Sequence, residues 1–444
     1  MADSPGLLVV GEAYVDLTLS SARTESKMRL GGVVHAARGL WASGVAYALA
    51  GICPKYLVDE VKDYVLAHGC TEFIWLGEVV GAPNVVVIGD VREVAYQGYE
   101  DLLRDRRVVV LNEHLDGLKS YTHILVFPGR FALEALRSAF SADAAFDFDV
   151  AYDLDHLSSL DSYRGHLRTI IVSTSSPLFA REAAEHMGGF LSQLKQLQAQ
   201  WLLLKENRGG SRLFDLDSDA VECIPAQLGE TVNSVGVGDV YSAVLSGLSG
   251  THGVVEAAWR GAQVATRYAQ TTYPDDLRRD TQRDAQIDLA TLRTLWGTFL
   301  PWHERPKQAI YLAAPDFSYI DKPEVDRVIN ALQYHNFKLR RPVEEVGELS
   351  EDAPLEKRQA VFAQDIEILN DCATVLAVPI GRDPGTLVEV GWALALSKPG
   401  IIFDPRGENN NTMVVAGNAA YSTDLDECLN GLFRVLGQPC PYRV

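Results

Sequence analysis

One carboxylate stands alone in an apolar stretch near the end of the chain. Between Leu387 and Leu396 the sequence reads LVEVGWALAL, and Glu389 is its only charged residue. A helix that is apolar on every side is expected to be buried, and a buried carboxylate costs free energy unless a partner or a reaction uses it. The alternative is a capping box, in which Glu389 reaches back to the backbone N–H of Thr386. The residues alone leave both interpretations open.

Two more carboxylates are placed where they could share a site with Glu389. Apolar residues lie at helical spacing from Asp365, namely Val361, Phe362 and Leu369. Asp365 is therefore expected on or beside the buried stripe of its helix; the alternative is a boundary residue that pairs with a neighbouring helix. Asp383 follows an expected strand, at the edge of an α/β sheet where ligands bind. We expect Asp365, Asp383 and Glu389 to converge on one cleft.

A glycine-containing turn forms a second motif. The sequence NSVGVGD at 233–239 precedes an apolar helix. Gly236, Val237 and Gly238 can point several backbone N–H groups toward one spot, and the positive end of the helix behind them suits a phosphate charge. Asp239 could then remove a proton from a substrate hydroxyl. The alternative is a structural N-cap aspartate after a glycine loop.

An α/β framework is expected to position both motifs. Short apolar runs alternate with helical stretches, at 7–10, 85–88, 124–127, 170–172 and 201–204. This alternation predicts an α/β fold with a largely parallel sheet. The pattern restarts with a new strand at 309–313, after a boundary near 301–308. We therefore predict two domains, at 1–300 and 308–444.

The bulk composition excludes several classes of protein. The net charge of −19 repels nucleic-acid backbones, so no nucleic acid polymer is expected as a partner. None of the six cysteines forms a CxxC pair or lies in a zinc-ligand cluster, so no metal site is predicted. The N-terminus lacks a signal peptide pattern, and no apolar run approaches the roughly 20 residues of a membrane span. A cytoplasmic protein without a membrane partner is expected.

The C-terminal motifs resemble those of the nucleoside 2-deoxyribosyltransferase family. The matching segments are YLAAP at 311–315, DPGT followed by EVGWA within 383–393, and SKP at 397–399. The likeness covers about residues 309–405 and implies a smaller, flavodoxin-like parallel-sheet domain that needs no cofactor. Ala314 stands where the family usually has glycine, which narrows the turn near the pocket.

This resemblance implies a role for each carboxylate. Glu389 would be the nucleophile that attacks the anomeric carbon, as in retaining glycosidases. Tyr311 would orient Glu389, while Asp365 and Asp383 would bind the leaving base or supply its proton. Asn411 lies in a segment similar to one that can reach a neighbouring subunit's site in the family, and would bind substrate. A second base completes transfer, and water completes hydrolysis.

The N-terminal motifs resemble those of the ribokinase-like sugar and nucleoside kinases. Beside NSVGVGD, the matching segments are GEAYVD at 11–16, the glycine pair at 31–32, and KENRGG at 205–210. The likeness implies a ribokinase-like α/β sandwich that uses ATP and Mg²⁺ if it is active. It also implies roles for single residues: Asp239 as base, Gly236, Val237 and Gly238 as anion hole, Asp16, Gly31 and Gly32 as sugar ligands, and Asn207 and Gly209 as nucleotide ligands.

Two departures from the kinase pattern leave phosphoryl transfer open. Ala36, beside His35, stands where the family usually has a sugar-binding asparagine, and the sequence STSSP at 173–177 replaces its N-x-x-E element. Loss of a carboxylate near the metal would weaken charge neutralisation in phosphoryl transfer.

Three interpretations of the whole chain follow. It is an enzyme that acts on nucleosides or nucleotides, or a nucleotide sensor in which a degenerate kinase domain controls or merely scaffolds a glycosidase domain, or a glycosidase for a larger N-glycoside such as NAD. Each predicts a small-molecule nucleoside or nucleotide as partner. Both families often oligomerise, so a homo-oligomer is expected.

Overall fold

The computed structural model describes residues 6–20, 25–112, 116–151, 153–295, 297–350 and 352–438. These residues form two compact units. The N-terminal unit contains the described residues up to 92 together with 97–299, and the C-terminal unit contains 93–96 together with 300–438. Five of the six cysteines are buried and free, and the sixth, Cys440, lies outside the described residues. None of the described helices is both long and apolar enough to cross a bilayer.

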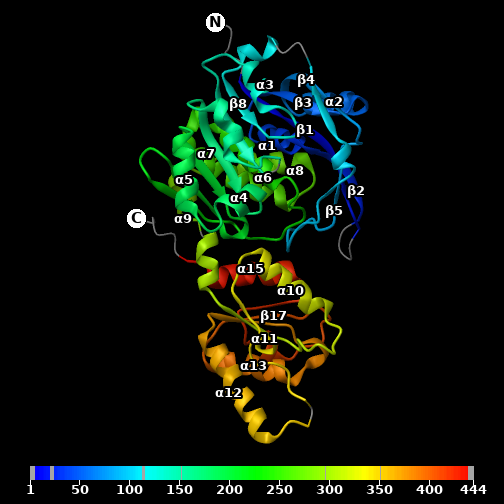
Figure 1. Cartoon of the computed structure of the whole chain (residues 1–444), viewed down its shortest axis with the longest axis vertical. Coiled ribbons are helices and arrows are strands. Elements are labelled where there is room, and N and C mark those ends of the chain that lie inside the picture. Colours follow the sequence, from blue (N-terminus) through cyan, green and yellow to red (C-terminus); the bar gives the residue numbers. More distant parts are fainter. Residues whose placement is uncertain are drawn as a thin grey trace. The chain divides into compact units, whose positions relative to one another are not determined.

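A largely parallel sheet forms the centre of the N-terminal unit (Figure 1). Its described strands follow the order β13-β12-β11-β10-β9-β8-β1-β3-β4-β7, with β2 and β5 beside β1, and β6 beside β5. The strands from β11 to β4 in this order are parallel, and most are buried apolar runs, as expected for a sheet covered on both faces. The strands are β1 Leu7–Thr18, β2 Lys27–Gly32, β3 Tyr47–Cys53, β4 Cys70–Val80, β5 Val85–Ile88, β6 Glu100–Asp101, β7 Val108–Leu111, β8 His123–Val126, β9 Ala145–Val150, β10 Leu167–Ser173, β11 Trp201–Lys205, β12 Ser211–Asp215 and β13 Val221–Ile224. The α/β prediction is confirmed.

Strand β1 belongs to two layers of this sheet. Its first half pairs with β3 and β8, while its second half, from Ala13 onward, pairs with β2 and β5. Asp16 lies in the second half, at the carboxyl side of the parallel strands where α/β proteins bind ligands.

Helices surround the N-terminal sheet, and α1, α6, α7 and α8 pack against one another (Figure 1). The apolar stretches after the glycine motif become α6 and α7, whose buried faces join the main core. The helices of this unit are α1 Val33–Ala42, α2 Val58–Ala67, α3 Leu133–Ser138, α4 Pro177–Glu182, α5 Met187–Gln196, α6 Val237–His252, α7 Val254–Gln270, α8 Pro274–Asp284 and α9 Leu289–Thr294.

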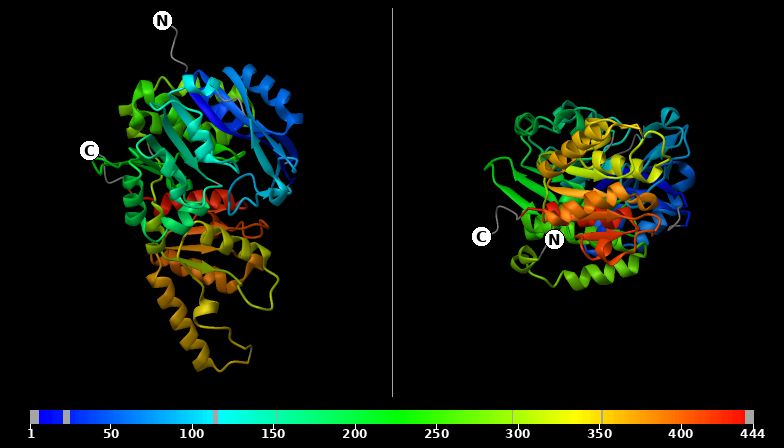
Figure 2. Two further views of the ribbon diagram at one scale, coloured as in Figure 1. Left: turned by 45° about the horizontal axis from the view of Figure 1, so that its top comes forward. Right: turned by 90° about the horizontal axis from the view of Figure 1, so that it is seen from below.

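The C-terminal unit is built on a second, smaller sheet of five parallel strands in the order β15-β14-β16-β17-β18. Helices α10 and α15 lie on one face of it, and α12 and α13 on the other (Figures 1 and 2). The strands are β14 Ile310–Ala313, β15 Leu339–Arg340, β16 Thr374–Ala377, β17 Gly400–Phe403 and β18 Ala420–Ser422. The helices are α10 Pro323–Tyr334, α11 Pro342–Glu345, α12 Leu355–Asp371, α13 Pro384–Ala395, α14 Thr412–Val415 and α15 Leu425–Leu436.

A buried ion pair joins three elements of the N-terminal unit. Lys205 at the end of β11 places its ammonium 2.8 Å from Asp149 Oδ2 in β9. The same ammonium donates to Ser242 Oγ at 3.1 Å and to the Gly238 carbonyl at 3.2 Å, both in α6. Lys205 is 8% exposed and Asp149 is 1% exposed, so water screens neither charge. Because a buried charge without its partner is strongly unfavourable, this pair fixes α6 against the sheet.

Replacing this lysine is predicted to destabilise the N-terminal unit. Lys205→Met leaves the Asp149 carboxylate buried without a cation, and the free energy of unfolding should fall by about 3 kcal/mol. Urea denaturation measures this change. Lys195→Met is the matched control, because the Lys195–Asp219 pair is largely exposed and should contribute less than about 1 kcal/mol. Equal effects of the two substitutions would show that the buried pair has no such role.

Candidate active site

Tyr311 and Glu389 meet on the face of the C-terminal sheet that α13 covers. Tyr311 lies in β14 and is fully buried, while Glu389 lies in α13, which packs against β14 and β16. The Tyr311 hydroxyl donates a hydrogen bond of 2.6 Å to Glu389 Oε1. Burial and the neighbouring carboxylate raise the pKa of Tyr311 well above its usual value, so the phenol remains a donor.

Glu389 is surrounded by negative rather than positive charge. Burial raises its pKa to about 7; the Tyr311 hydrogen bond opposes this shift, while the charges of Asp365 and Asp383 add to it. Burial also raises the pKa of Asp365 to about 6, and its buried Oδ1 has no hydrogen-bond partner. The structure therefore brings Tyr311, Asp365, Asp383 and Glu389 into one electrostatically coupled group. Shifted carboxyl groups of this kind are typical of catalytic acids and nucleophiles.

Asp383 begins the helix that carries Glu389. Its Oδ2 accepts hydrogen bonds from the Thr386 backbone N–H at 2.7 Å and from the Thr386 hydroxyl at 2.8 Å. The helix starts at Pro384, so the capping box between Thr386 and Glu389 is wrong: Asp383 is the N-cap, and Glu389 is free to meet Tyr311.

The expectation that this helix is buried on every side is also wrong. Val388 is 58% exposed, Trp392 39% and Leu396 43%. Only one side of α13 faces the sheet, and its other side remains apolar at the surface.

Among the described contacts, Asn411 bonds to its own helix and not to Tyr311, Asp365, Asp383 or Glu389. It is the N-cap of α14, where its side-chain oxygen accepts from the Met413 N–H at 3.0 Å, and it is exposed. No sequence motif indicated the neighbouring carboxylate Asp404, which holds the loop after β17. This buried carboxylate accepts from the Asn409 N–H and the Tyr421 hydroxyl, each at 2.7 Å. Its position directly after the apolar strand β17 was the available signal.

A second group that sequence reasoning missed lies at the carboxyl ends of β14 and β15. Asp316 is 4% exposed and accepts from Arg341 Nε at 2.7 Å and from the Lys322 ammonium. The loop after Tyr311 is therefore fixed by an ion-pair cluster beside the same edge of the sheet.

In the N-terminal unit, the Asp16 carboxylate bonds to side chains of the protein. Its Oδ2 lies 2.8 Å from His35 Nε2, and His35 Nδ1 lies 2.6 Å from the Tyr268 hydroxyl. Burial lowers the pKa of His35 to about 4, so its ring is neutral at physiological pH. Arg29 adds a positive charge 3.7 Å from the Asp16 carboxylate. Asp16 thus has internal partners where the resemblance predicted a sugar hydroxyl.

His35 fills the space between Asp16 and the glycine turn. A methyl group added to Gly236 would lie 2.2 Å from the His35 ring, and one added to Gly31 would lie 2.0 Å from Asp16. Gly32 adopts a left-handed φ of 59° at the start of α1, where only glycine avoids strain. These glycines therefore allow the protein's own side chains to pack closely.

The glycine turn supplies fewer free donors than its sequence predicted. Gly236 is the N-cap of α6, so the interpretation of Asp239 as N-cap is wrong. The Val237 N–H donates to the Ser234 carbonyl at 3.1 Å, which leaves Gly238 and Asp239 at the open start of the helix. Burial and the Asp149 charge raise the pKa of Asp239 to about 8, against the opposing effect of Lys205. The carboxyl group is therefore mostly protonated at pH 7.

The other expected nucleotide-site residues form a tight turn. The Gly209 N–H donates to the Glu206 carbonyl at 3.0 Å, and the Asn207 carbonyl accepts from Gly210 at 3.1 Å. The acidic side chains around the glycine turn do not fit a Mg²⁺ ion, because the ammonium of Lys205 already neutralises Asp149. Within the described ranges, no group of three or more His, Cys, Asp or Glu side chains is placed to hold a metal ion.

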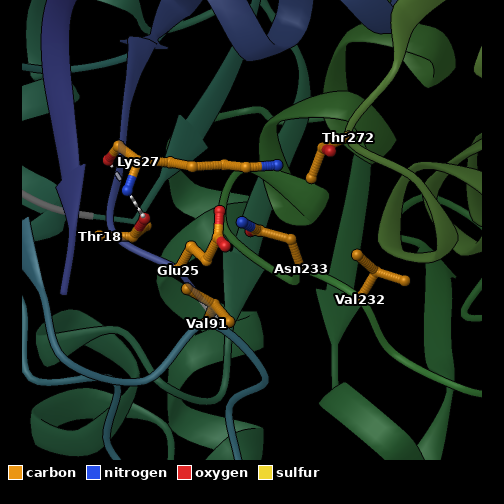
Figure 3. A pocket seen from close by; sticks show the side chains of 7 residues that line it. All are labelled: Thr18, Glu25, Lys27, Val91, Val232, Asn233 and Thr272. Atoms are coloured by element: carbon orange, nitrogen blue, oxygen red, sulfur yellow. Dashed lines mark hydrogen bonds between the residues drawn. The ribbon is translucent and has the colours of Figure 1, made fainter. Parts of the chain in front are cut away.

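A pocket of about 200 Å³ lies beside this closed site. In Figure 3 the Lys27 side chain extends across it toward Thr272, and the Glu25 carboxylate lies beside the amide of Asn233. Asn233 Oδ1 accepts from Arg29 Nη2 at 3.0 Å, so the pocket wall is linked to the cation that faces Asp16.

Comparison with known proteins identifies the C-terminal class. Residues 310–421 match the family model of nucleoside 2-deoxyribosyltransferases, which confirms the resemblance for about a quarter of the chain. No curated protein matches the chain significantly.

Solved sugar-kinase structures match the remaining part. A ribokinase from Giardia lamblia is 12% identical with a TM-score of 0.48, and covers 64% of this chain and 99% of its own. A ribokinase from Thermotoga maritima is 12% identical with a TM-score of 0.47, and covers 64% of this chain and 100% of its own. An Arabidopsis thaliana ribokinase complexed with ribose and ATP is 15% identical with a TM-score of 0.44, at 64% and 100% coverage.

The buried charge of Glu389 predicts a pH-dependent effect on stability. With a pKa near 4.5 unfolded and about 7 folded, Glu389 lowers stability as pH rises between these values, and its full effect is present above pH 7. Glu389→Gln should therefore raise the free energy of unfolding at pH 8 by roughly 1–3 kcal/mol and have little effect at pH 4. Thermal unfolding at both pH values tests this. Glu367→Gln, on the exposed side of α12, is the control; a variant as stable as the parent at pH 8 would contradict the argument.

Proposed function

We propose that the C-terminal unit cleaves or transfers at the N-glycosidic bond of a nucleoside or nucleotide, with Glu389 as nucleophile. The observation that carries this proposal is the hydrogen bond from the buried Tyr311 to a Glu389 carboxylate that has two further carboxyl groups nearby. The match of residues 310–421 to the deoxyribosyltransferase family supports the same chemistry.

In this proposal the two oxygens of Glu389 have different tasks. Oε1 accepts from Tyr311, so Oε2 is the oxygen that attacks the anomeric carbon. A carbon–oxygen bond to Glu389 forms while the bond from that carbon to the base nitrogen breaks. A second base then displaces Glu389 in transfer, or water does so in hydrolysis, and either route restores the carboxylate.

The leaving base needs a proton, and Asp365 is suited to supply it. Its pKa of about 6 keeps a fraction protonated near neutral pH, and its Oδ1 has no other hydrogen-bond partner. Asp383 uses Oδ2 to cap α13, so its contribution to the base comes through its other oxygen. NAD carries the same type of bond between a ribose and a base, so it belongs among the substrates to be tested.

Base release is the direct test of this proposal. Glu389→Gln should lower the release of free base from nucleosides, nucleoside monophosphates or NAD by at least about 1,000-fold, because the amide is no nucleophile. Chromatography of the reaction products, with and without an acceptor base, measures the loss and names the substrate class. Glu367→Gln should retain the parent rate. Base release that is undiminished in Glu389→Gln would refute the assignment of the nucleophile.

We infer a different role for the N-terminal unit: it binds a small molecule without transferring phosphate. His35 fills the space at Asp16, Asp239 is mostly protonated at pH 7, and the acidic side chains around the glycine turn do not fit Mg²⁺. These features support the interpretation of a nucleotide-sensing unit beside a glycosidase rather than a second enzyme.

Two assays together distinguish ligand binding from phosphoryl transfer in the N-terminal unit. ATP and nucleosides should raise the melting temperature of the full chain, while no substrate-dependent ADP appears with ATP, Mg²⁺ and a panel of sugars and nucleosides. Asp239→Asn should bind as the parent does, because a protonated carboxyl and an amide carry the same charge. Substrate-dependent ADP formation that disappears in Asp239→Asn would instead establish a kinase.

A further inference from the structure

The backbone between strand β16 and helix α13 has an unfavourable conformation. Two consecutive residues there, Gly381 and Arg382, have left-handed φ angles of 64° and 55°. Glycine adopts such an angle without strain, but arginine does not, and a strained residue persists only where its surroundings hold it. Asp383 follows directly and caps α13. We call residues 379–383 the cap turn; the orientation of α13 depends on the contacts that hold it.

The loop that follows β17 holds the cap turn by three hydrogen bonds. Glu408 Oε2 accepts from the Gly381 backbone N–H at 2.9 Å, and the Glu408 carbonyl accepts from Arg382 Nε at 2.9 Å. The side-chain amide of Asn409 donates to the Pro379 carbonyl at 2.7 Å. Both left-handed residues, and the residue at the start of the turn, are therefore bonded to this one loop.

Asp404 fixes this loop in turn. The Asp404 side chain is buried, and its oxygens accept from the backbone N–H groups of Glu408 at 3.1 Å and Asn409 at 2.7 Å. It also accepts from the hydroxyl of Tyr421 at 2.7 Å, and Tyr421 lies in β18, which pairs with β17. Because Asn409 is buried as well, water does not compete for its hydrogen bonds. A chain of hydrogen bonds thus connects the sheet, through Asp404, to the cap turn.

We propose that Glu408 and Asn409 are positioning residues for Glu389. They hold the cap turn in its left-handed conformation, so that Asp383 caps α13 in a single orientation. That orientation places Glu389 2.6 Å from the Tyr311 hydroxyl. A nucleophile must be held close to its reactive geometry, and a displacement of about 1 Å can lower the rate on the order of 100-fold. The effect on the reaction rests on the proposed function, whereas the effect on the cap turn does not.

The kinetics of base release by the full chain test this role. Glu408→Ala removes the acceptor for the Gly381 N–H and should lower kcat by roughly 10- to 100-fold with little change in KM, because Glu389 is displaced while the substrate contacts remain. Glu408→Gln keeps a side-chain oxygen for the same N–H and should recover most of the parent kcat. Arg406→Gln is the matched control, since it removes only an exposed ion pair of the same loop with Glu324. An unchanged kcat in Glu408→Ala, or an equal loss in Glu408→Gln or Arg406→Gln, would overturn the proposal.

Hydrogen exchange followed by mass spectrometry tests the cap turn without any substrate. In Glu408→Ala, peptides that cover 380–389 should exchange their amide hydrogens at least about tenfold faster than in the parent, because a strained turn opens once its bonds are lost. Peptides from α10 should exchange as they do in the parent. Parent-like exchange at 380–389, or equally faster exchange in α10, would contradict a local effect on the cap turn.

The two proposals fail separately. Local opening of the cap turn in Glu408→Ala, in a chain that releases no base, would keep the effect on the turn and refute the proposed reaction. A Glu389-dependent reaction with the same kcat in Glu408→Ala would keep the reaction and refute the positioning role.

Discussion

The hydrogen bond between Tyr311 and Glu389 is the interaction on which the C-terminal unit depends. It lets a carboxylate lie against a sheet of apolar strands without a cation, at a distance of 2.6 Å from a fully buried phenol. The start of α13 follows from the same need, since the Asp383 cap fixes the helix so that Glu389 faces β14. A lysine or arginine in that place would stabilise the charge more strongly and would lower its nucleophilicity.

At the expected site of the N-terminal unit Asp16 and Asp149 have cationic partners, whereas at the expected site of the C-terminal unit Asp365 and Glu389 have none among the described residues. In the N-terminal unit Asp16 faces His35 and Arg29, and Asp149 faces Lys205, so these acids are neutralised within the fold. In the C-terminal unit Glu389 and Asp365 are shifted to pKa values of about 7 and 6 by burial, with only the Tyr311 hydroxyl opposing the shift of Glu389. Paired charges hold structure together, whereas unpaired ones near neutrality remain available for proton and group transfer. This contrast supports placing the glycosidic chemistry in the second unit, whereas in the first unit Asp239, with a pKa of about 8, is mostly protonated at pH 7 and is a poor base for phosphoryl transfer.

The sequence was sufficient to predict the fold class and the carboxylates of the C-terminal site, but not the contacts of the N-terminal site. Alternating apolar runs predicted the α/β class, and residue type and spacing selected Asp365, Asp383 and Glu389. The family resemblance added Tyr311, and the structure brings these four residues together. The residues left the start of α13 open because Asp383 and Thr386 are both good caps, and backbone geometry decides for Asp383. The contact of His35 with Asp16 joins residues 19 apart on a strand and a helix, and that of His35 with Tyr268 spans 233 residues. No local rule contains such a contact; it exists only once the sheet has formed.

The exposed apolar side of α13 follows from the same constraint that buries Glu389. A helix with apolar residues on all sides can turn only one of them to the sheet, and here the need to place Glu389 beside Tyr311 fixes which one. Val388 and Trp392, adjacent to Glu389 in sequence or one turn away, then face outward, and Phe362 on α12 meets Trp392 there. The outer side of α13 therefore keeps apolar side chains at the surface, at Val388, Trp392 and Leu396.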